Sequence, residues 1–372
     1  GIGGDAVMAR LGDVCKKGSS NITQKDLEGH SGNYPIFGAS GFITNVDFYQ
    51  QEKPYIAVIK DGAGIGRIMK LPEKSSIIGT MQYIIPNDTV DISYLAYAME
   101  HMDLAKYFTG ATIPHIYFKD YQKEELPLPI LDEQRKIAAV LDKVSDLIAK
   151  RRQQLDKLDL LIKSRFVEIF YNTTGNANWP IVTMADISTD MRTGPFGSAL
   201  HHDEFVETGI FVLGIDNAVE NRFSYNRMRY ITEEKYEQLK RYTVRPGDVI
   251  ITIMGTVGRS AIIPDNIPKA INTKHLACLT IDRSKAQPTF ICSAFQMHPE
   301  IRQQLTGQAK GAIMDGLNLT IIKKLCFKLP PIEMQNKFVE FFNLTENTKT
   351  TISRSLEKLE TLKKALMQEY FG

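Results

Sequence analysis

The sequence has no strong excess of charge, no long apolar run and no closely spaced cysteines, and each absence excludes a class of protein. Lys and Arg number 45 and Asp and Glu 43, which gives a formal net charge of +2. This balance excludes a histone-like polycation and an acidic-tail protein, but it does not exclude a local basic face. No run of ~18 apolar residues is present, so we expect no transmembrane helix and no membrane partner.

The four cysteines are Cys15, Cys278, Cys292 and Cys326, and no two of them have Cys-x-x-Cys spacing. The sequence therefore predicts neither a zinc site nor a dithiol redox motif. Scattered thiols are typical of a reducing compartment, so we expect a cytoplasmic protein. Residues 1–8 lack the charged and apolar regions of a signal peptide, and we assign them to a loose leader or an expression remnant outside the fold.

Motifs for catalysis are also missing. The sequence contains no G-x-x-x-x-G-K-[ST] phosphate-binding loop and no Asn-Pro-Pro-Phe or Asp-Pro-Pro-Tyr methyltransferase motif. Pro264-Asp265 is not followed by the Asp/Glu-x-Lys element of a nuclease at a fitting distance, and we interpret it as a turn. No Ser/His/Asp or Cys/His combination has a defensible spacing. We therefore expect no catalytic, cofactor or metal site, so this chain is predicted not to be an enzyme by itself.

Two local patterns have both a functional and a structural interpretation. Asp61-Gly-Ala-Gly-Ile-Gly66 resembles a nucleotide-binding loop, but Gly255-Thr-Val-Gly258, its counterpart in the second half, loses the acidic residue. We therefore expect tight turns in which glycine supplies a positive φ. His201-His202-Asp203-Glu204 has metal-ligating residue types. Adjacent side chains point in different directions, which favours a solvated or DNA-facing loop.

The most informative feature that is present is an internal duplication. Residues 129–170 align without a gap with residues 330–371, at a constant offset of 201. Upstream, Tyr55–Ile59 and Val249–Ile253 each precede a glycine turn that ends in Gly-Arg. At ~150 residues per domain, a chain of 372 residues has room for about two and a half domains. Each half is therefore predicted to be a mixed β-rich domain followed by a long helix.

Both long segments have apolar positions spaced by four and three residues, which is a heptad stripe. Pro129 precedes the first helix, and we expect Asp132 to be its N-cap. A helix of 39 residues is about 58 Å long. Since the chain supplies two helices of equal length, we expect them to pair antiparallel with each other, rather than to form a zipper between chains. The residues predicted at this helix-pair interface are Ile137, Leu141, Val144, Ile148, Leu155, Leu158, Ile162, Phe338, Phe342, Ile352, Leu356, Leu359 and Leu366.

These patterns define domains at 9–128 and 181–329, helices at 129–171 and 330–372, and a linker at 172–180. The predicted fold class is α+β: two globular mixed α/β domains separated by two long antiparallel coiled-coil helices, with a pseudo-twofold internal duplication. The predicted strands are Tyr55–Ile59, Ile77–Ile85, Phe211–Ile215, Asp248–Met254 and Leu276–Ile281. The predicted domain helices are Ser93–Tyr107, Glu233–Lys240 and Pro288–Gln304.

Basic and polar residues on the glycine-rich loops of both domains favour contact with double-stranded DNA. For each residue alone, plain surface charge is the better explanation, but the set has the chemistry to neutralise phosphates and to reach base edges. The residues predicted to bind DNA in the first domain are Lys16, Lys17, Ser19, Lys60, Arg67, Thr112, His115 and Tyr117. Those in the second domain are Arg192, Ser198, His201, Arg222, Arg227, Arg229, Arg259, Lys274, His275 and Lys310.

The sequence resembles the specificity (S) subunit of type I restriction-modification systems. The resemblance covers nearly the whole chain from Ala9, in the order domain, helix, domain, helix. Asn33–Gly41 is similar to another variant of the same recognition domain. The stretches that carry the resemblance are Leu126-Pro-Leu-Pro-Ile-Leu-Asp-Glu-Gln-Arg-Lys-Ile137 with its second copy Leu329–Gln335, Thr193-Gly-Pro-Phe-Gly-Ser-Ala-Leu200 with Gly209–Leu213, and Tyr242-Thr-Val-Arg-Pro-Gly-Asp-Val249 leading to Gly258-Arg259.

The resemblance implies two target-recognition domains, each of which reads one half of a bipartite, asymmetric DNA sequence. It also implies that two adenine-methyltransferase subunits and two restriction/motor subunits dock on this subunit. S-adenosylmethionine, ATP and Mg²⁺ are then expected in the partners and not in this chain. Two alternatives remain open: a non-catalytic structural adapter that spaces two protein-binding domains, and the recognition part of a fused restriction-methylation enzyme.

Overall fold

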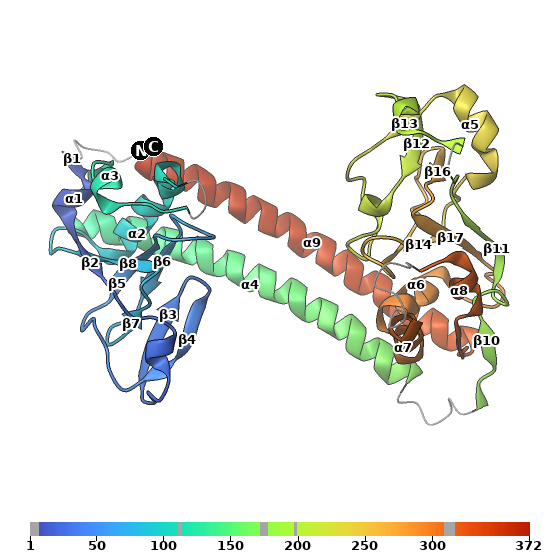
Figure 1. Cartoon of the computed structure of the whole chain (residues 1–372), viewed down its shortest axis with the longest axis horizontal. Helices are drawn as coiled ribbons and strands as arrows, with labels where there is room; N and C mark the ends of the chain where they lie inside the picture. Colours follow the sequence, from blue (N-terminus) through green and yellow to red (C-terminus); the bar gives the residue numbers. More distant parts are fainter. Residues whose placement is uncertain (1–6, 111–113, 172–177, 197–198, 309–316) are drawn as a thin grey trace. The chain divides into compact units, whose positions relative to one another are not determined.

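The computed structural model describes residues 7–110, 114–171, 178–196, 199–308 and 317–372. The chain divides into two compact units, one of residues 1–154 and 352–372 and one of residues 155–351. Each unit contains one globular domain and a part of two long helices, α4 (Leu131–Phe170) and α9 (Ile332–Phe371) (Figure 1). The predicted α+β class, with two mixed domains and two long helices, is confirmed.

The first globular domain is built on a four-stranded sheet of order β2-β8-β5-β6 and a three-stranded sheet of order β4-β3-β7. A separate ladder joins β1 to β9, the strand that precedes α4. Its elements are β1 (Val7–Arg10), α1 (Leu11–Val14), β2 (Cys15–Ser19), η1 (Lys25–Leu27), β3 (Tyr34–Gly38), β4 (Gly41–Val46), β5 (Tyr55–Ile59), β6 (Ile68–Leu71), β7 (Ser76–Ile77), β8 (Met81–Pro86), α2 (Ile92–His101), η2 (Leu104–Tyr107), α3 (Phe118–Tyr121) and β9 (Glu125–Leu128).

The second globular domain has a four-stranded sheet of order β11-β17-β14-β15, a three-stranded sheet of order β13-β12-β16 and a ladder of β10 with β18. Its elements are β10 (Ile181–Thr183), β11 (Ser188–Thr193), η5 (His202–Glu204), β12 (Ile210–Leu213), η6 (Ile215–Asn217), β13 (Tyr230–Ile231), α5 (Glu233–Leu239), η7 (Lys240–Tyr242), β14 (Val249–Thr252), β15 (Ser260–Ile262), β16 (Ala270–Asn272), β17 (Leu276–Ile281), α6 (Pro288–Met297), α7 (Pro299–Gln308), α8 (Leu319–Lys324) and β18 (Cys326–Lys328).

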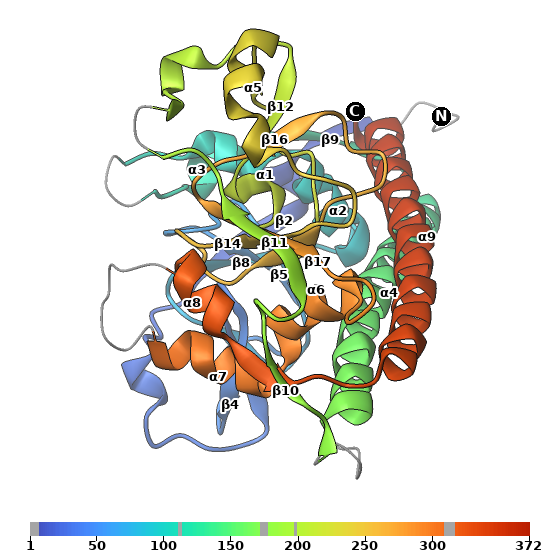
Figure 2. The same cartoon turned by 90° about the vertical axis from the view of Figure 1, so that its right-hand side faces the viewer.

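The two domains share one topology, strand for strand. Each has the same order in its four-stranded sheet, a parallel pair within its three-stranded sheet, and a short ladder next to a long helix. One face of the larger sheet packs against α2 in the first domain and against α6 in the second (Figures 1 and 2). The duplication therefore extends through both globular domains, although their sequences have diverged.

The first residues of the chain that the structure describes belong to the fold. Val7 and Met8 lie in β1 and pair with Leu128 and Pro127 of β9. The assignment of residues 7 and 8 to a leader is therefore wrong. Backbone hydrogen bonds to a distant strand hold this segment, and a composition-based reading of a chain end does not detect them.

Three predicted elements are interrupted where the backbone leaves the regular conformation. The run Ile77–Ile85 forms two strands, β7 and β8, and not one. The helix predicted at Ser93–Tyr107 ends at His101, because Asp103 adopts a left-handed conformation with φ of 48°. The helix predicted at Pro288–Gln304 is divided into α6 and α7 at His298, whose ψ of 120° is extended. The residue before a proline, here Pro299, is sterically disfavoured in the helical region.

The long helix α4 begins at Leu131, so Asp132 is inside the first turn and is not the N-cap. Its carboxylate lies 3.3 Å from Arg135 Nη1. Negative charge in the first turn still interacts favourably with the helix dipole. An acidic residue is therefore suited to the start of α4, but the helix begins one residue before Asp132 and not after it.

In the first unit, the beginning of α4 packs against the end of α9. Ile137 and Leu141 are buried in the same cluster as Met367 of α9. Further along α4, Arg152 Nη2 lies 2.6 Å from Glu360 Oε1. Residue numbers rise along α4 as they fall along α9, so the predicted antiparallel pairing is confirmed within this unit.

The second unit shows the same relationship with the other ends of the helices. Phe166 and Phe170 of α4 contact Phe338 of α9, with ring centroids 5.3 and 5.5 Å apart. Lys349 Nζ lies 2.6 Å from Asp159 Oδ1, which again pairs α4 with α9. The pairing is antiparallel here as well.

The predicted interface residues differ in burial. Phe166 and Phe170 take the place that a strict heptad gives to Arg165 and Ile169, because a straight helix of 3.6 residues per turn drifts from a 3.5-residue repeat. The buried residues of the predicted stripe are Ile137, Leu141, Val144, Ile148, Ile162 and Phe338. Those that are half-buried are Leu155, Leu158, Phe342, Ile352, Leu356, Leu359 and Leu366.

Candidate nucleic-acid interface

In the first domain, a cavity of about 310 Å³ gathers residues from four separate segments. Lys17 and Ser19 come from edge strand β2, and Lys60 follows β5. His115 and Tyr117 precede α3. These five residues were all predicted to bind DNA, and the fold brings them to one place although they span a hundred positions of sequence.

Backbone hydrogen bonds hold the segment before α3 against the end of β5. The Ile116 N–H donates to the Lys60 carbonyl at 3.0 Å, and the Gly62 N–H donates to the Pro114 carbonyl at 3.0 Å. The Asp61 carboxylate bonds the His115 ring and lies 3.8 Å from Lys60 Nζ. The loop that carries His115 and Tyr117 is therefore fixed by the glycine turn after β5.

This turn is the one whose glycines resemble a nucleotide loop. Gly62, Gly64 and Gly66 have φ of 80°, 86° and 79°. A Cβ at Gly66 would lie 2.4 Å from the Ala105 backbone nitrogen. The prediction of a tight turn with positive φ is confirmed, as it is at Gly255 and Gly258, whose φ are 69° and 80°.

Two polar residues of the first cavity, Gln82 and Lys119, were not among the predicted site residues. Gln82 belongs to β8 in the middle of an apolar run, where the alternation of a strand predicts a buried residue and not a site. Lys119 lies in α3, and its ammonium stands 5.2 Å from the centre of the Tyr117 ring. Only the position of Lys119, two residues after the predicted site residue Tyr117, could have indicated its place in the cavity.

In the second domain, a cavity of about 500 Å³ collects a different set of residues. It is lined by five residues predicted to bind DNA, which are His201, Arg227, Arg229, Lys274 and His275. Apolar side chains, such as Phe205, cover another part of its wall. The second cavity is thus cationic on one part of its wall and apolar on another.

Three loops are tied together around this cavity. The Val212 N–H donates to the Arg229 carbonyl at 2.8 Å, and the Thr273 N–H donates to the Leu213 carbonyl at 2.9 Å. Arg229 Nη2 also lies 3.0 Å from Asp216 Oδ2. Burial lowers the pKa of His275, and the nearby charges of Lys274 and Arg229 lower it further, so the neutral imidazole is favoured at pH 7.

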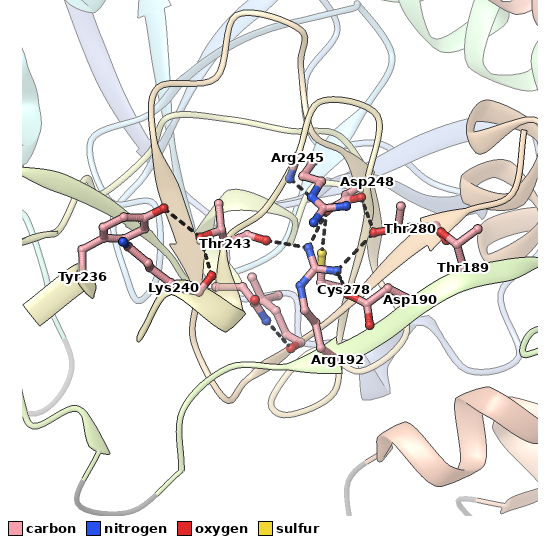
Figure 3. Close-up of polar contacts among 12 residues, drawn as sticks. Thr189, Asp190, Arg192, Tyr236, Lys240, Thr243, Arg245, Asp248, Cys278 and Thr280 are labelled. Carbon is pink, nitrogen blue, oxygen red and sulfur yellow. Dashed lines mark hydrogen bonds and ion pairs between the residues drawn. The ribbon is translucent and has the colours of Figure 1, made fainter. Parts of the chain in front are cut away.

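Arg192 was predicted to bind DNA, and the structure places it inside the second domain instead (Figure 3). Its guanidinium donates to Asp248 Oδ2 and to Asp190 Oδ2, both at 2.7 Å. It also donates to the Thr243 carbonyl at 2.7 Å and to Thr280 Oγ1 at 3.1 Å. The Arg192 side chain is 11% exposed and that of Asp248 is 1% exposed. Arg192 is a structural cation, because its donors are used to satisfy a buried carboxylate.

The remaining predicted residues that the structure describes lie outside both cavities. Lys16 alternates with Lys17 on β2, so its side chain is on the other face of the strand. Arg67 donates to the Ala39 carbonyl. Arg222 and Arg259 are exposed, and Arg222 Nε lies 3.5 Å from Glu220. The predicted residues that lie outside the described parts of the chain are Thr112, Ser198 and Lys310.

The histidine-rich stretch of the second domain serves as a local cap. The Glu204 carboxylate accepts from the His201 N–H at 2.6 Å and pairs with Lys235 at 2.6 Å. Within the described residues, no group of three His, Cys, Asp or Glu side chains could hold a metal ion. The same part of the chain contains no helix that is long and apolar enough to cross a membrane.

The chain thus contains two copies of one fold, each with a cationic cavity. The family model of the type I restriction modification DNA specificity domain matches residues 4–159 and again residues 175–361. The chain therefore belongs to this family and is a specificity subunit of a type I restriction-modification system.

Curated relatives agree over most of the chain. The specificity subunit of the type I restriction enzyme MjaVIII of Methanocaldococcus jannaschii is 23% identical over an alignment of 397 positions with gaps. The alignment includes 98% of this chain and 91% of that protein. The specificity subunit of the Escherichia coli enzyme EcoBI is 22% identical, and the match covers 71% of this chain and 61% of that protein.

Solved structures show the same fold. The crystal structure of the S subunit of a type I restriction-modification system from M. genitalium superposes with a TM-score of 0.68, at 15% identity over 100% of this chain and 98% of that one. A chain from a study of complex assembly and conformational transition of the type I system has a TM-score of 0.56, at 14% identity over 98% of this chain and 97% of that one.

Proposed function

We propose that each globular domain reads one half of a bipartite, asymmetric DNA target. The observation that carries this proposal is the contrast between the two cavities. They are built on one topology, yet Lys17, Ser19 and Lys60 contribute to the first, and Arg227 and Lys274 to the second. Two domains with one scaffold and different polar loops are suited to two different half-site sequences, because side-chain donors and acceptors read the base edges.

The two long helices set the number of unread base pairs between the half-sites. A helix of 40 residues, the length of both α4 and α9, is about 60 Å long. B-DNA advances by ~34–36 Å per turn, so a spacer of this size accommodates half-sites about one turn apart. Antiparallel pairing of the helices supports a fixed spacing, because each helix buries part of its apolar stripe against the other and neither has to expose that stripe to water.

The chain directs the enzymatic subunits to the target and does no chemistry itself. Adenine-methyltransferase and restriction/motor subunits, two of each, dock on it, and they hold S-adenosylmethionine, ATP and Mg²⁺. The membership of the family and the likeness to a chain from an assembled type I system support this role.

The experiment is a comparison of genome-wide adenine methylation in the host with and without this gene. Loss of one bipartite methylated motif, restored by the wild-type gene, is the expected result and gives the target sequence. A matched complementation with Lys274→Ala tests the second domain, where weakened methylation of the same motif is expected. An unchanged methylome, with the partner subunits shown to be expressed, contradicts the proposal and favours the structural adapter.

A further inference from the structure

The first domain contains a buried polar pair that its duplicate lacks. Gln82 lies opposite Ser19 and Val58 in its sheet, and Ala277 occupies the same place opposite Thr193 and Ile251. At the constant offset of 201, Tyr121 corresponds to Ile322, and both are buried. A Gln–Tyr pair in one copy thus stands where the other copy has an Ala–Ile pair.

The Gln82 amide forms part of the wall of the first cavity. Its side chain is nearly enclosed, at 6% exposure, and its Oε1 accepts a hydrogen bond from the Tyr121 hydroxyl at 2.8 Å. No residue that the structure describes accepts a hydrogen bond from the Gln82 amide nitrogen. Because Gln82 lines the cavity, this nitrogen is free to donate a hydrogen bond to a ligand there.

The side chains around Gln82 carry positive charge and hydrogen-bond donors. Lys17, Lys60 and Lys119 line the cavity with Ser19, and none of its lining residues is acidic. Asp61, a carboxylate 3.8 Å from Lys60 Nζ, is outside the lining and already bonds His115. The cavity therefore suits a ligand that is anionic and only accepts hydrogen bonds.

We propose that this cavity binds one backbone phosphate of the DNA target, with the Gln82 amide and the Ser19 hydroxyl as neutral donors and the three lysines as charge partners. The inference rests on the proposed function of the domain. A phosphate oxygen accepts from all these groups, whereas a base edge presents donors as well as acceptors. The contact fixes the register of the first domain on the duplex and carries no sequence information.

The first test uses the full chain, the duplex target identified from the methylome and a pool of duplexes with altered first half-sites. In Lys60→Ala, affinity falls by the same factor for every sequence, and the slope of log K against log salt becomes shallower by ~0.9. Between ~50 and ~200 mM salt, this variant then loses about 3.5-fold less affinity than wild type does. Lys53→Ala, an exposed lysine of the same domain outside the cavity, is the matched control and keeps the wild-type slope.

The second test locates the phosphate. Duplexes with a neutral methylphosphonate at single positions of the first half-site are bound by wild type and by the double variant Gln82→Ala/Tyr121→Phe. The double variant leaves no hydroxyl unpaired and approaches the Ala–Ile pair of the second domain, so the fold is preserved. One methylphosphonate position is expected to weaken binding by wild type more than binding by this variant or by Lys60→Ala.

Several outcomes overturn the inference. A change in base preference in Lys60→Ala assigns the cavity to base reading, and equal sensitivity of all variants at every methylphosphonate position removes the phosphate contact. If inorganic phosphate binds in the cavity and does not compete with the duplex, the cavity is a site for a free anion and not for the DNA backbone. Failure of wild type to bind any duplex contradicts the proposed function itself, which separates that failure from failure of the phosphate site.

Discussion

Gln134 and Gln335 are 201 residues apart in the chain and make the same three hydrogen bonds at the starts of the two long helices. The Gln134 side-chain oxygen accepts from the Asp91 N–H at 2.8 Å. Its amide nitrogen donates to the carbonyls of Thr89 and Pro129, at 3.1 and 2.7 Å. Asp91 is the N-cap of α2, so this glutamine ties α4 to the helix of its own domain.

Gln335 repeats the arrangement in the second unit. Its oxygen accepts from the Gln287 N–H at 2.9 Å, and its nitrogen donates to the carbonyls of Lys285 and Pro330, at 3.3 and 2.8 Å. Gln287 is the N-cap residue of α6. Both glutamines are buried, so the duplication preserved a polar connection between each long helix and its domain.

Replacement of either glutamine by Ala should destabilise its unit. The change leaves a backbone N–H and two carbonyls without their buried partner, and an unsatisfied buried group costs about 1–3 kcal/mol. We expect a loss of this size in the free energy of unfolding for both Gln134→Ala and Gln335→Ala, measured by denaturant titration. Lys337→Ala, an exposed position of the same helix turn, is the control and should change it by less than about 0.5 kcal/mol. Equal effects in variant and control would show that the connection is not stabilising.

Replacement of Arg192 should affect folding and not only DNA binding. Arg192→Ala leaves Asp248 buried without its cation, which costs about 3–5 kcal/mol. Lys274→Ala, on the exposed side of the second cavity, should weaken DNA binding with stability unchanged within ~0.5 kcal/mol. Thermal unfolding and duplex binding of the two variants separate these roles. If Arg192→Ala is as stable as wild type but binds DNA weakly, Arg192 is a DNA-binding residue and not a structural one.

The second unit should lose stability as the pH falls below about 6.5 because of His298. This histidine is buried against Phe166 and Phe327, and no described residue bonds its Nδ1. Burial lowers the pKa of His298, although Glu300 partly opposes the effect. The unfolded chain therefore binds a proton at higher pH than the native chain does, and stability falls as pH falls through the unfolded pKa of ~6.5.

Hydrogen exchange of α6 and α7 between pH 8 and pH 5 measures this effect. His298→Leu should flatten the pH dependence of protection, whereas His202→Gln, at an exposed position in the same unit, should leave it unchanged. An identical pH profile for wild type and His298→Leu would assign the dependence to other groups.

A proline in the middle of α4 should uncouple the two half-sites. Leu155 is half-buried on the stripe, and Leu155→Pro breaks the helix at a cost of ~3 kcal/mol or more. Methylation of the bipartite motif should be lost, while each domain keeps its topology. Leu155→Ala retains the helix and is the matched control, for which methylation at the original spacing is expected. A wild-type methylome in the proline variant would contradict the fixed spacing.

Local chemistry explains which parts of the fold were predictable. The strands Tyr55–Ile59 and Leu276–Ile281 were predicted to the residue, because continuous apolar runs between turn signals are typical of buried strands. The break at His298 follows from the proline after it and was missed because the apolar pattern continues across it. The strand at Val7–Arg10 depends on pairing with Glu125–Leu128, which no local pattern encodes.

The duplication, the two long helices with their stripes and the family follow from the sequence, because periodicity, gapless offset and motifs are linear properties of the chain. Which polar residues share a cavity depends instead on the three-dimensional packing of the chain. Lys17, Lys60 and His115 meet because strand order and backbone hydrogen bonds bring their segments together. Arg192 has the same chemistry as Arg227, yet it is enclosed beside Asp248, since burial depends on what packs around a side chain and not on its type.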